Sequence, residues 1–270
     1  MSSLDLLSIG RVSVDLYAEQ PGVTMSDVTT FRKSIGGTAT NVAVATARYG
    51  HAVALATRVG DDQFGRYVAD ALRNTFNVDP RFVATHPTLK TPLAFAELDP
   101  PEDPTIIFYR EPAAPDMEIE TTPPLLDAVD TARILWIPAS RFAIGRSRTT
   151  VTELLQRRNR KHHTVLDLDW RPMFWDSEEQ AHAAISPMLD HVTIAIGNRK
   201  ECEVAVGTDD PDEAADRMLD RGLDAAIVKL GGDGVMVATP QLRERLSPYP
   251  VEVVCGLGSG DAFGGAFCHG

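Results

Sequence analysis

Residues 192–206 read Val-Thr-Ile-Ala-Ile-Gly-Asn-Arg-Lys-Glu-Cys-Glu-Val-Ala-Val, an apolar run that leads directly into a helical pattern. The same unit recurs from residue 132 onward, with strands predicted at 134–137, 165–168 and 225–230 and helices at 147–160, 177–189 and 212–221. Short apolar strands that alternate with helices indicate an α/β fold, whose mostly parallel central sheet is covered by helices on both faces. Ligands of such sheets bind at the carboxyl ends of the strands.

The N-terminal half has a second group of strands. After a short buried strand at 4–9, apolar and polar residues alternate along 12–17, which is typical of a strand with one exposed face. Strands are also predicted at 91–98 and 105–110, on either side of a proline-rich turn. We expect these segments to form a small separate sheet, called the lid below.

The order of the elements predicts how the chain is organised. We expect one α/β domain over residues 1–270, with lid strands from about 11–35 and 90–112 inserted into it. Near the end of the chain, 235–238 and 251–254 have the pattern of an antiparallel pair.

Composition excludes several classes of protein. Lys and Arg number 26 against 38 Asp and Glu, and the single basic run, 157–161, ends a predicted helix, so no nucleic-acid partner is expected. No apolar run approaches the roughly 20 residues that a membrane span needs. The three cysteines, Cys202, Cys255 and Cys268, lack the spacing of a zinc site or a disulfide framework, which favours a reducing cytoplasm.

The most informative motif is Gly256-Leu257-Gly258-Ser259-Gly260-Asp261-Ala262-Phe263-Gly264-Gly265-Ala266, just after a predicted strand. The amides of Gly258, Ser259 and Gly260 can approach an anion closely, and a following helix adds the positive end of its dipole. Asp261 can then accept the proton of an attacking hydroxyl. For an isolated loop, the alternative is a tight turn with Asp261 as a helix cap.

A second motif covers residues 34–50, where Gly36 and Gly37 open a helix built almost entirely of small residues. Gly50 suits the end of that helix. The glycine amides and the Asn41 side chain can bind the hydroxyls of a substrate. Close packing against the sheet, without any ligand contact, explains the same residues equally well.

Together, the two motifs, their order and their spacing resemble the PfkB, or ribokinase-like, family of carbohydrate kinases. The resemblance implies a ribokinase-like fold with a small β-sheet lid, ATP and Mg²⁺ as cofactors, and Asp261 as the base in transfer of the γ-phosphate to a hydroxyl. Family members continue for several elements beyond the position of Gly270, so we expect a C-terminal part of the fold to be missing. Cys255 stands where the family has Asp or Asn.

The resemblance also assigns binding residues. Asp15 corresponds to the family aspartate that binds substrate hydroxyls, although its position also suits a solvent-facing strand residue. Asn198 and Glu201 match a family motif that organises Mg²⁺ through water, although they also suit a capped helix start. The family's nucleotide loop matches four residues that equally suit a hairpin turn: Lys229, Gly231, Gly232 and Gly234.

The segment 167–175 is closely similar to the 5-dehydro-2-deoxygluconokinases of inositol breakdown within this family. That likeness implies a sugar-acid substrate, with Tyr109, Arg110 and Arg171 in the binding site, because arginine presents a planar fork to a carboxylate. A 2-keto-3-deoxygluconate kinase or another sugar kinase is the alternative activity, and an inactive truncated binding fragment is the non-enzymatic one. The family further implies a homodimer formed through the lid.

Overall fold

The computed structural model describes residues 3–20, 22–97, 105–143, 145–251 and 256–270. Its contacts group into two compact units. Unit 1 comprises Met1–Ile9 and Glu120–Tyr249, and unit 2 comprises Gly10–Ile119 and Pro250–Gly270. The expectation of one domain with inserted lid strands stays a prediction.

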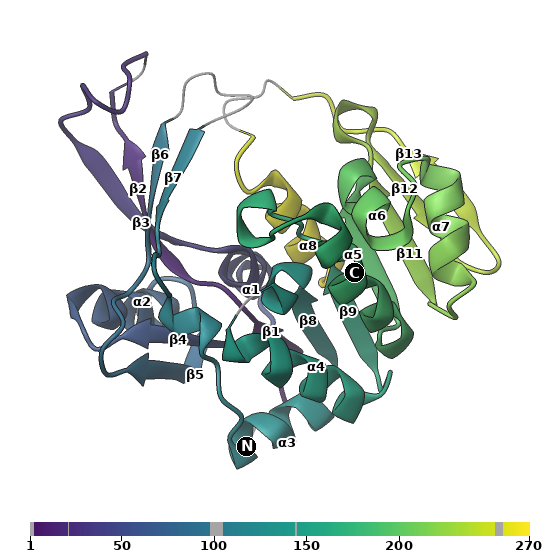
Figure 1. Ribbon diagram of the computed structural model, residues 1–270, viewed down its shortest axis with the longest axis horizontal. Helices are drawn as coiled ribbons and strands as arrows, with labels where there is room; N and C mark the ends of the chain where they lie inside the picture. Colours follow the sequence, from purple (N-terminus) through teal and green to yellow (C-terminus); the bar gives the residue numbers. More distant parts are fainter. Residues whose placement is uncertain (1–2, 21, 98–104, 144, 252–255) are drawn as a thin grey trace. The chain divides into compact units, whose positions relative to one another are not determined.

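The strands of unit 1 form a sheet in the order β13-β12-β11-β10-β9-β8-β1 (Figure 1). Their bounds are β1 Leu6–Ile9, β8 Ile134–Pro138, β9 His163–Asp167, β10 Ile194–Asn198, β11 Ala225–Lys229, β12 Val235–Ala238 and β13 Arg243–Leu246. The five strands from β11 to β1 in this order pair in parallel, whereas β12 and β13 are antiparallel additions. The predicted parallel sheet is confirmed, and its apolar runs are largely buried as expected.

Five α-helices of unit 1 connect these strands: α3 Pro123–Thr131, α4 Arg146–Arg158, α5 Glu178–Ile185, α6 Arg199–Val206 and α7 Pro211–Leu219. Short 3₁₀ turns lie at Ala139–Phe142, Pro172–Phe174, Ser186–His191 and Gly231–Asp233. Helix α7 begins where the Asp210 side chain accepts a hydrogen bond from the Glu213 amide, with Pro211 as its first residue. Helix α6 ends at Gly207, whose φ of 79° allows the left-handed turn that stops the helix.

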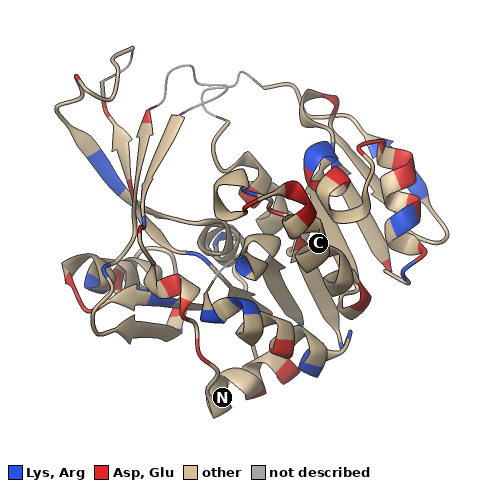
Figure 2. Ribbon diagram, viewed as in Figure 1, with Lys and Arg blue, Asp and Glu red and all other residues tan. Residues whose placement is uncertain are grey.

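The described partners of strand β12 include a strand that the sequence did not predict. Strand β12 pairs with β11 on one side and β13 on the other, whereas the predicted partner 251–254 falls almost entirely outside the described residues. The sequence of β13, Arg-Glu-Arg-Leu, is exposed throughout and has no apolar alternation. Its arginines Arg243 and Arg245 instead form ion pairs with Asp212 of α7, a helix on which both charge signs are interspersed (Figure 2). Residues 252–255 lie outside the described part of the chain.

Unit 2 contains the predicted lid, a four-stranded sheet in the order β3-β2-β6-β7. Its strands are β2 Ser13–Ala18, β3 Phe31–Gly36, β6 Leu93–Glu97 and β7 Thr105–Tyr109. Strand β2 is antiparallel to β3 and parallel to β6, and β6 is antiparallel to β7. The proline-rich turn predicted before β7 lies outside the described residues.

The rest of unit 2 consists of β4 Val53–Gly60, β5 Asp79–His86, α1 Thr38–Arg48, α2 Gln63–Asn74, α8 Ser259–Phe267 and a 3₁₀ turn at Pro115–Met117. Strands β4 and β5 pair in parallel. Helix α1 ends at Tyr49 and is followed by Gly50 with a φ of 88°, as predicted. Among the described helices of the chain, none combines the length and apolarity needed to cross a bilayer.

Candidate active-site residues

The two glycine-rich motifs meet in unit 2. Asn41 lies in the first turn of α1 and Asp261 in the first turn of α8, 220 residues further along the chain. The Asn41 Nδ2 donates a hydrogen bond of 2.7 Å to the Asp261 Oδ2. The structure therefore brings the predicted base next to the predicted sugar-binding amide, while the catalytic role of Asp261 and the substrate-binding role of Asn41 stay predictions.

Helix α8 begins with open space beside it. Gly258 adopts a φ of 77°, and no heavy atom of the described residues lies within 4 Å of the place a Cβ would take. The amides of Ser259 and Gly260 belong to the first turn of α8, where N–H groups have no acceptor four residues back within the helix. Within the described residues, the Ser259 amide makes a long hydrogen bond, 3.3 Å, to the carbonyl of Gly256. This arrangement can accept an anion; Cys255, just before it, lies outside the described residues.

The carboxylate of Asp15 fills the space that a side chain at Gly36 would need. A Cβ on Gly36 would overlap both oxygens of this carboxylate, so only glycine fits there while Asp15 keeps its rotamer. Ser13 Oγ donates to Asp15 Oδ1 at 2.5 Å, and the Tyr17 hydroxyl donates to Oδ2 at 3.3 Å. Burial raises the pKa of Asp15, although the two hydrogen bonds and the charge of Arg11 act to lower it.

Gly37 has a different reason to be glycine. Its φ is 102°, and a Cβ there would lie 2.5 Å from the carbonyl oxygen of Arg11. The same stretch of backbone is held by side chains of α1, because Thr40 Oγ1 donates to the Arg11 carbonyl at 2.9 Å. The Arg11 guanidinium in turn donates to Thr38 Oγ1 at 2.6 Å. Gly37 thus serves close packing against the backbone of residues 11 and 12, and a substrate contact of its amide stays a prediction.

Tyr109 lies away from Asp15 on the lid. In the strand register, Tyr109 is opposite Leu93, and Asp15 is opposite Ala94, so the two side chains project from opposite faces of the lid sheet. The Tyr109 ring is 64% exposed and packs edge-to-face on Phe95 at 5.3 Å. The structure does not bring Tyr109 together with the other predicted sugar-binding residues of unit 2.

Arg110 is buried and already has a carboxylate partner within the chain. Its guanidinium forms an ion pair with Asp116 at 2.6 Å, and the Asp116 side chain is fully buried. The second oxygen of Asp116 accepts the Val12 amide at 3.1 Å. Asp116 therefore links Arg110, just after β7, to Val12, just before β2, and any contact of Arg110 with a substrate would add to this structural role.

In unit 1, the polar residues gather at the carboxyl ends of the parallel strands. Asp167 is the last residue of β9, and Asp169 follows it, with both side chains buried. Asp169 accepts the Ser140 hydroxyl at 2.6 Å and the Arg171 Nε at 2.8 Å. The Arg171 side chain remains 45% exposed, so its guanidinium is oriented by Asp169 and accessible to a ligand.

The next two strands bring Asn198, Glu201 and Lys229 together. Asn198 and Glu201 form a reciprocal cap: Asn198 Oδ1 accepts the Glu201 amide at 2.9 Å, and Glu201 Oε2 accepts the Asn198 amide at 2.6 Å. Lys229 Nζ lies 3.4 Å from Glu201 Oε2. Burial acts to lower the pKa of Lys229, but the charges of Asp167, Glu201 and Asp169 outweigh it and raise the pKa. Asn198 and Glu201 therefore do cap the start of α6, as the alternative to a role in Mg²⁺ binding states, and the neighbouring Lys229 stays charged.

The loop after β11 is a tight turn, with the carbonyl of Gly234 accepting the Leu230 amide at 2.8 Å. Gly234 has a φ of 92°, and a Cβ there would overlap the carbonyl oxygen of Leu246 in β13, so this glycine is required by packing. Around Gly231 and Gly232 the described residues leave open space. Gly231 and Gly232 can therefore accept a ligand close to their backbone atoms.

Among the described residues, no group of three His, Cys, Asp or Glu side chains could hold a metal ion directly. A magnesium ion near Glu201 would therefore need water or phosphate oxygens as its other ligands, which suits a hard cation that keeps several waters.

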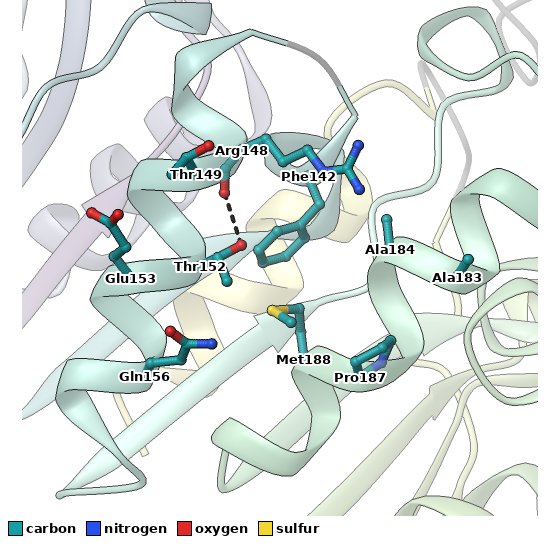
Figure 3. Close-up of a pocket in the computed structure, with 10 residues that line it drawn as sticks. All are labelled: Phe142, Arg148, Thr149, Thr152, Glu153, Gln156, Ala183, Ala184, Pro187 and Met188. Atoms are coloured by element: carbon teal, nitrogen blue, oxygen red, sulfur yellow. Dashed lines mark hydrogen bonds between the residues drawn. The ribbon is translucent and has the colours of Figure 1, made fainter.

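A separate cavity of about 410 Å³ lies in unit 1 between α4 and the segment that includes α5 and the 3₁₀ turn Ser186–His191. Figure 3 shows its lining residues, which are Phe142, Arg148, Thr149, Thr152, Glu153, Gln156, Ala183, Ala184, Pro187 and Met188. None of them is a residue that the sequence assigns to the active site.

The sequence did not assign roles to several residues that hold the predicted ones in place. Ser13 and Tyr17 lie two positions on either side of Asp15 in one strand, and this period of two places them on the same face. For Asp116 and Ser140 no comparable local pattern exists, because their partners lie on other elements.

The chain is similar in sequence to known carbohydrate kinases. The family model described as pfkB family carbohydrate kinase matches residues 3–270. The 5-dehydro-2-deoxygluconokinase of Geobacillus thermodenitrificans (strain NG80-2) is 30% identical over 275 residues, which cover 99% of this chain and 81% of the relative.

Two solved structures share the fold. The PfkB protein from Polaromonas sp. JS666 superposes with a TM-score of 0.87 at 24% identity, covering 98% of this chain and 88% of that one. Fructokinase from Vibrio cholerae O395, in a form with fructose, ADP and calcium ion bound, superposes with a TM-score of 0.83 at 23% identity, covering 98% and 82%. These likenesses show the ribokinase-like α/β fold.

Proposed function

Because the chain belongs to the pfkB family of carbohydrate kinases, we propose that it phosphorylates 5-dehydro-2-deoxygluconate, a sugar acid of inositol breakdown, with ATP. The terminal hydroxyl of the sugar acid attacks the γ-phosphorus, the bond from that phosphorus to the β–γ bridging oxygen breaks, and the products are the 6-phosphate and ADP. The observation that carries this proposal is the hydrogen bond between Asn41 and Asp261.

In the proposed reaction, the Asp261 carboxylate takes the proton of the attacking hydroxyl. The hydrogen bond from Asn41 holds the Oδ2 atom of Asp261 in place, and this also orients the other oxygen, Oδ1, because the carboxylate is rigid and planar. The amides of Gly258, Ser259 and Gly260 bind the negative charge on the transferring phosphoryl group, supported by the dipole of α8. Asp15, beside Gly36 and Gly37, accepts hydrogen bonds from other hydroxyls of the sugar.

Arg171 supports an acidic substrate over a neutral one. Its guanidinium is held by Asp169 through Nε and is partly exposed, so it can bind a carboxylate or a phosphate. Arg110 gives less support, because its guanidinium is paired with the buried Asp116. Tyr109 stays a proposed substrate contact, although it shares no face of the lid with Asp15.

The nucleotide is proposed to bind to unit 1. Lys229, Gly231, Gly232 and Gly234 would contact the phosphates from the ends of β11 and the turn after it, and Asn198 and Glu201 would hold Mg²⁺ through water. When bound, Mg²⁺ neutralises phosphate charge in the transition state. The charged state of Lys229 and the open space at Gly231 and Gly232 support this assignment.

The lid also supports a homodimer. One face of the lid sheet carries an edge-to-face row of three rings, with Phe31 and Phe95 at 5.4 Å and Phe95 and Tyr109 at 5.3 Å. Ile107 lies opposite Phe95 in the register and is 38% exposed. An exposed apolar face of this kind suits contact with a second copy of the chain. The free, buried thiol of Cys202 agrees with a cytoplasmic enzyme.

A substrate panel tests the proposed reaction. ADP release in a coupled assay with MgATP should be fastest with 5-dehydro-2-deoxygluconate, slower with 2-keto-3-deoxygluconate, and slowest with fructose or ribose. Faster turnover of the neutral sugars would refute the acid specificity, and faster turnover of 2-keto-3-deoxygluconate would reassign the substrate. Stabilisation by MgATP without turnover of any sugar would mean that the chain binds its ligands without catalysis.

A further inference from the structure

Helices α1 and α8 of unit 2 contact each other at regular intervals. Three contacts recur every four residues along the two helices and just past their C-terminal ends, namely Asn41 with Asp261, Ala45 with Gly265, and Tyr49 with His269. Residues four apart lie on the same face of a helix, so these contacts form one continuous line of contact between the two helices. We call it the α1–α8 contact line.

The middle of this contact line depends on the absence of a side chain at Gly265. A Cβ on Gly265 would overlap the Cβ of Ala45 and would lie 3.1 Å from two backbone atoms, Ala45 C and Thr46 N. The hydroxyl of Thr46, which bonds the Val42 carbonyl at 2.9 Å, also approaches the carbonyl oxygen of Gly265 at 3.4 Å. The two helix backbones therefore approach so closely here that position 265 has no room for a side chain larger than hydrogen.

The far end of the contact line is held by aromatic rings. The Tyr49 and His269 rings stack with centroids 4.5 Å apart and planes 7° from parallel. His51 Nε2 lies 2.9 Å from His269 Nδ1, within hydrogen-bond distance. The line is thus fixed by contacts at both ends and by close packing in the middle.

We propose that Gly265 and Ala45 are positioning residues for Asp261, because their close contact sets the distance between α8 and α1 at which the Asn41 amide reaches the Asp261 carboxylate. This inference rests on the proposed function, in which Asp261 is the base. A helix transmits a displacement along its length, and Asp261 lies one turn, about 6 Å, from Gly265. A hydrogen bond of 2.7 Å is lost when its atoms separate by about a further 1 Å.

The test replaces Gly265 with alanine. We expect G265A to lower kcat by about 10- to 100-fold, because a misplacement near 1 Å costs about that much. KM for ATP should change less than kcat does, since Lys229 and the glycines proposed to contact the nucleotide phosphates belong to unit 1, and only the amides at the start of α8 would move with Gly265. The double variant G265A/A45G should recover part of the lost kcat, because the nearest remaining backbone atoms are 3.1 Å away. A266S, on the exposed side of the same helix, is the matched control and should retain wild-type kcat.

A second readout follows the hydrogen bond itself. The side-chain amide resonance of Asn41, assigned by its loss in N41A, should shift in D261N, shift in the same direction in G265A, and return toward the wild-type position in G265A/A45G. If G265A does not fold, A45S places one added atom at the same contact and is expected to give the same changes.

The two readouts separate the outcomes. A folded G265A with wild-type kcat and an unshifted Asn41 resonance would overturn the proposal, as would equal losses of kcat in G265A and A266S. Recovery of kcat without recovery of the resonance would also contradict it. If the wild-type chain phosphorylates no sugar, the proposed function fails, and the resonance alone then decides whether Gly265 sets the Asn41–Asp261 contact.

Discussion

Replacing Gly36 with alanine should damage sugar binding through one identified side chain. The added Cβ overlaps the Asp15 carboxylate, so that carboxylate must leave the position fixed by Ser13 and Tyr17. A hydrogen bond to a charged group contributes about 1.5–3 kcal/mol. Loss of one such bond between a sugar hydroxyl and Asp15 raises KM for the sugar by about 10- to 150-fold. Overpacking in addition costs about 1–3 kcal/mol of stability.

The assay is steady-state ADP release at varied sugar and at varied ATP, together with thermal unfolding. KM for ATP serves as the internal control and should stay within about twofold of wild type. A double-mutant cycle with D15A isolates the cause, because the three atoms nearest to the alanine Cβ at position 36 all belong to the Asp15 carboxylate. KM for the sugar in G36A/D15A should equal that of D15A alone.

Two results would refute this reasoning. One is a G36A enzyme with wild-type KM for the sugar, which would mean that Asp15 does not bind it. The other is strictly additive effects of G36A and D15A on that KM, which would mean that the glycine acts independently of Asp15.

Three further predictions concern charged groups. Since burial raises the pKa of Asp15, ionisation of this carboxyl group opposes folding. D15N should therefore be more stable than wild type at pH 7, and this gain in stability should disappear as the pH falls through the Asp15 pKa. Thermal unfolding from pH 4 to 8 measures the difference, and a D15N protein that is less stable throughout this range would contradict the prediction. Replacing Arg110 with methionine removes the guanidinium that lies 2.6 Å from the buried Asp116 carboxylate and should cost about 3–5 kcal/mol of stability in urea unfolding, whereas a loss under 1 kcal/mol would show this ion pair to be dispensable. Replacing Lys229 with methionine should raise KM for ATP at least about tenfold while KM for the sugar stays constant, and the reverse pattern in ADP-release assays would place Lys229 on the sugar side.

The sequence predicted the parts of the fold in which burial produces a clear pattern. Strands β8, β9, β10 and β11 are short apolar runs followed by amphipathic helices, and all four were found. Strand β13 was missed because its charged residues face solvent and the neighbouring α7, which leaves no apolar period to recognise. The strand, helix and strand over residues 53–86 were not predicted either, although all three elements are regular in the structure.

For the active site, the sequence identified residue types but not their partners. Spacing could not show that Asn41 contacts Asp261, because the contact depends on how α1 and α8 pack. The small residues of α1 were expected to bring it close to the sheet, and in the structure Ala45 also lies against Gly265 of α8. Arg110 was assigned to the substrate by its charge, and its buried partner Asp116 becomes apparent only in three dimensions.

The most direct test of the central claim is the turnover of D261N with 5-dehydro-2-deoxygluconate and MgATP, measured beside the wild-type chain. The substitution preserves size and removes the base, so kcat should fall by about 10²- to 10⁴-fold while the unfolding temperature and KM for ATP stay close to wild type. A folded D261N that retains most of its kcat would contradict the assignment of Asp261 as the base, and with it the proposed mechanism.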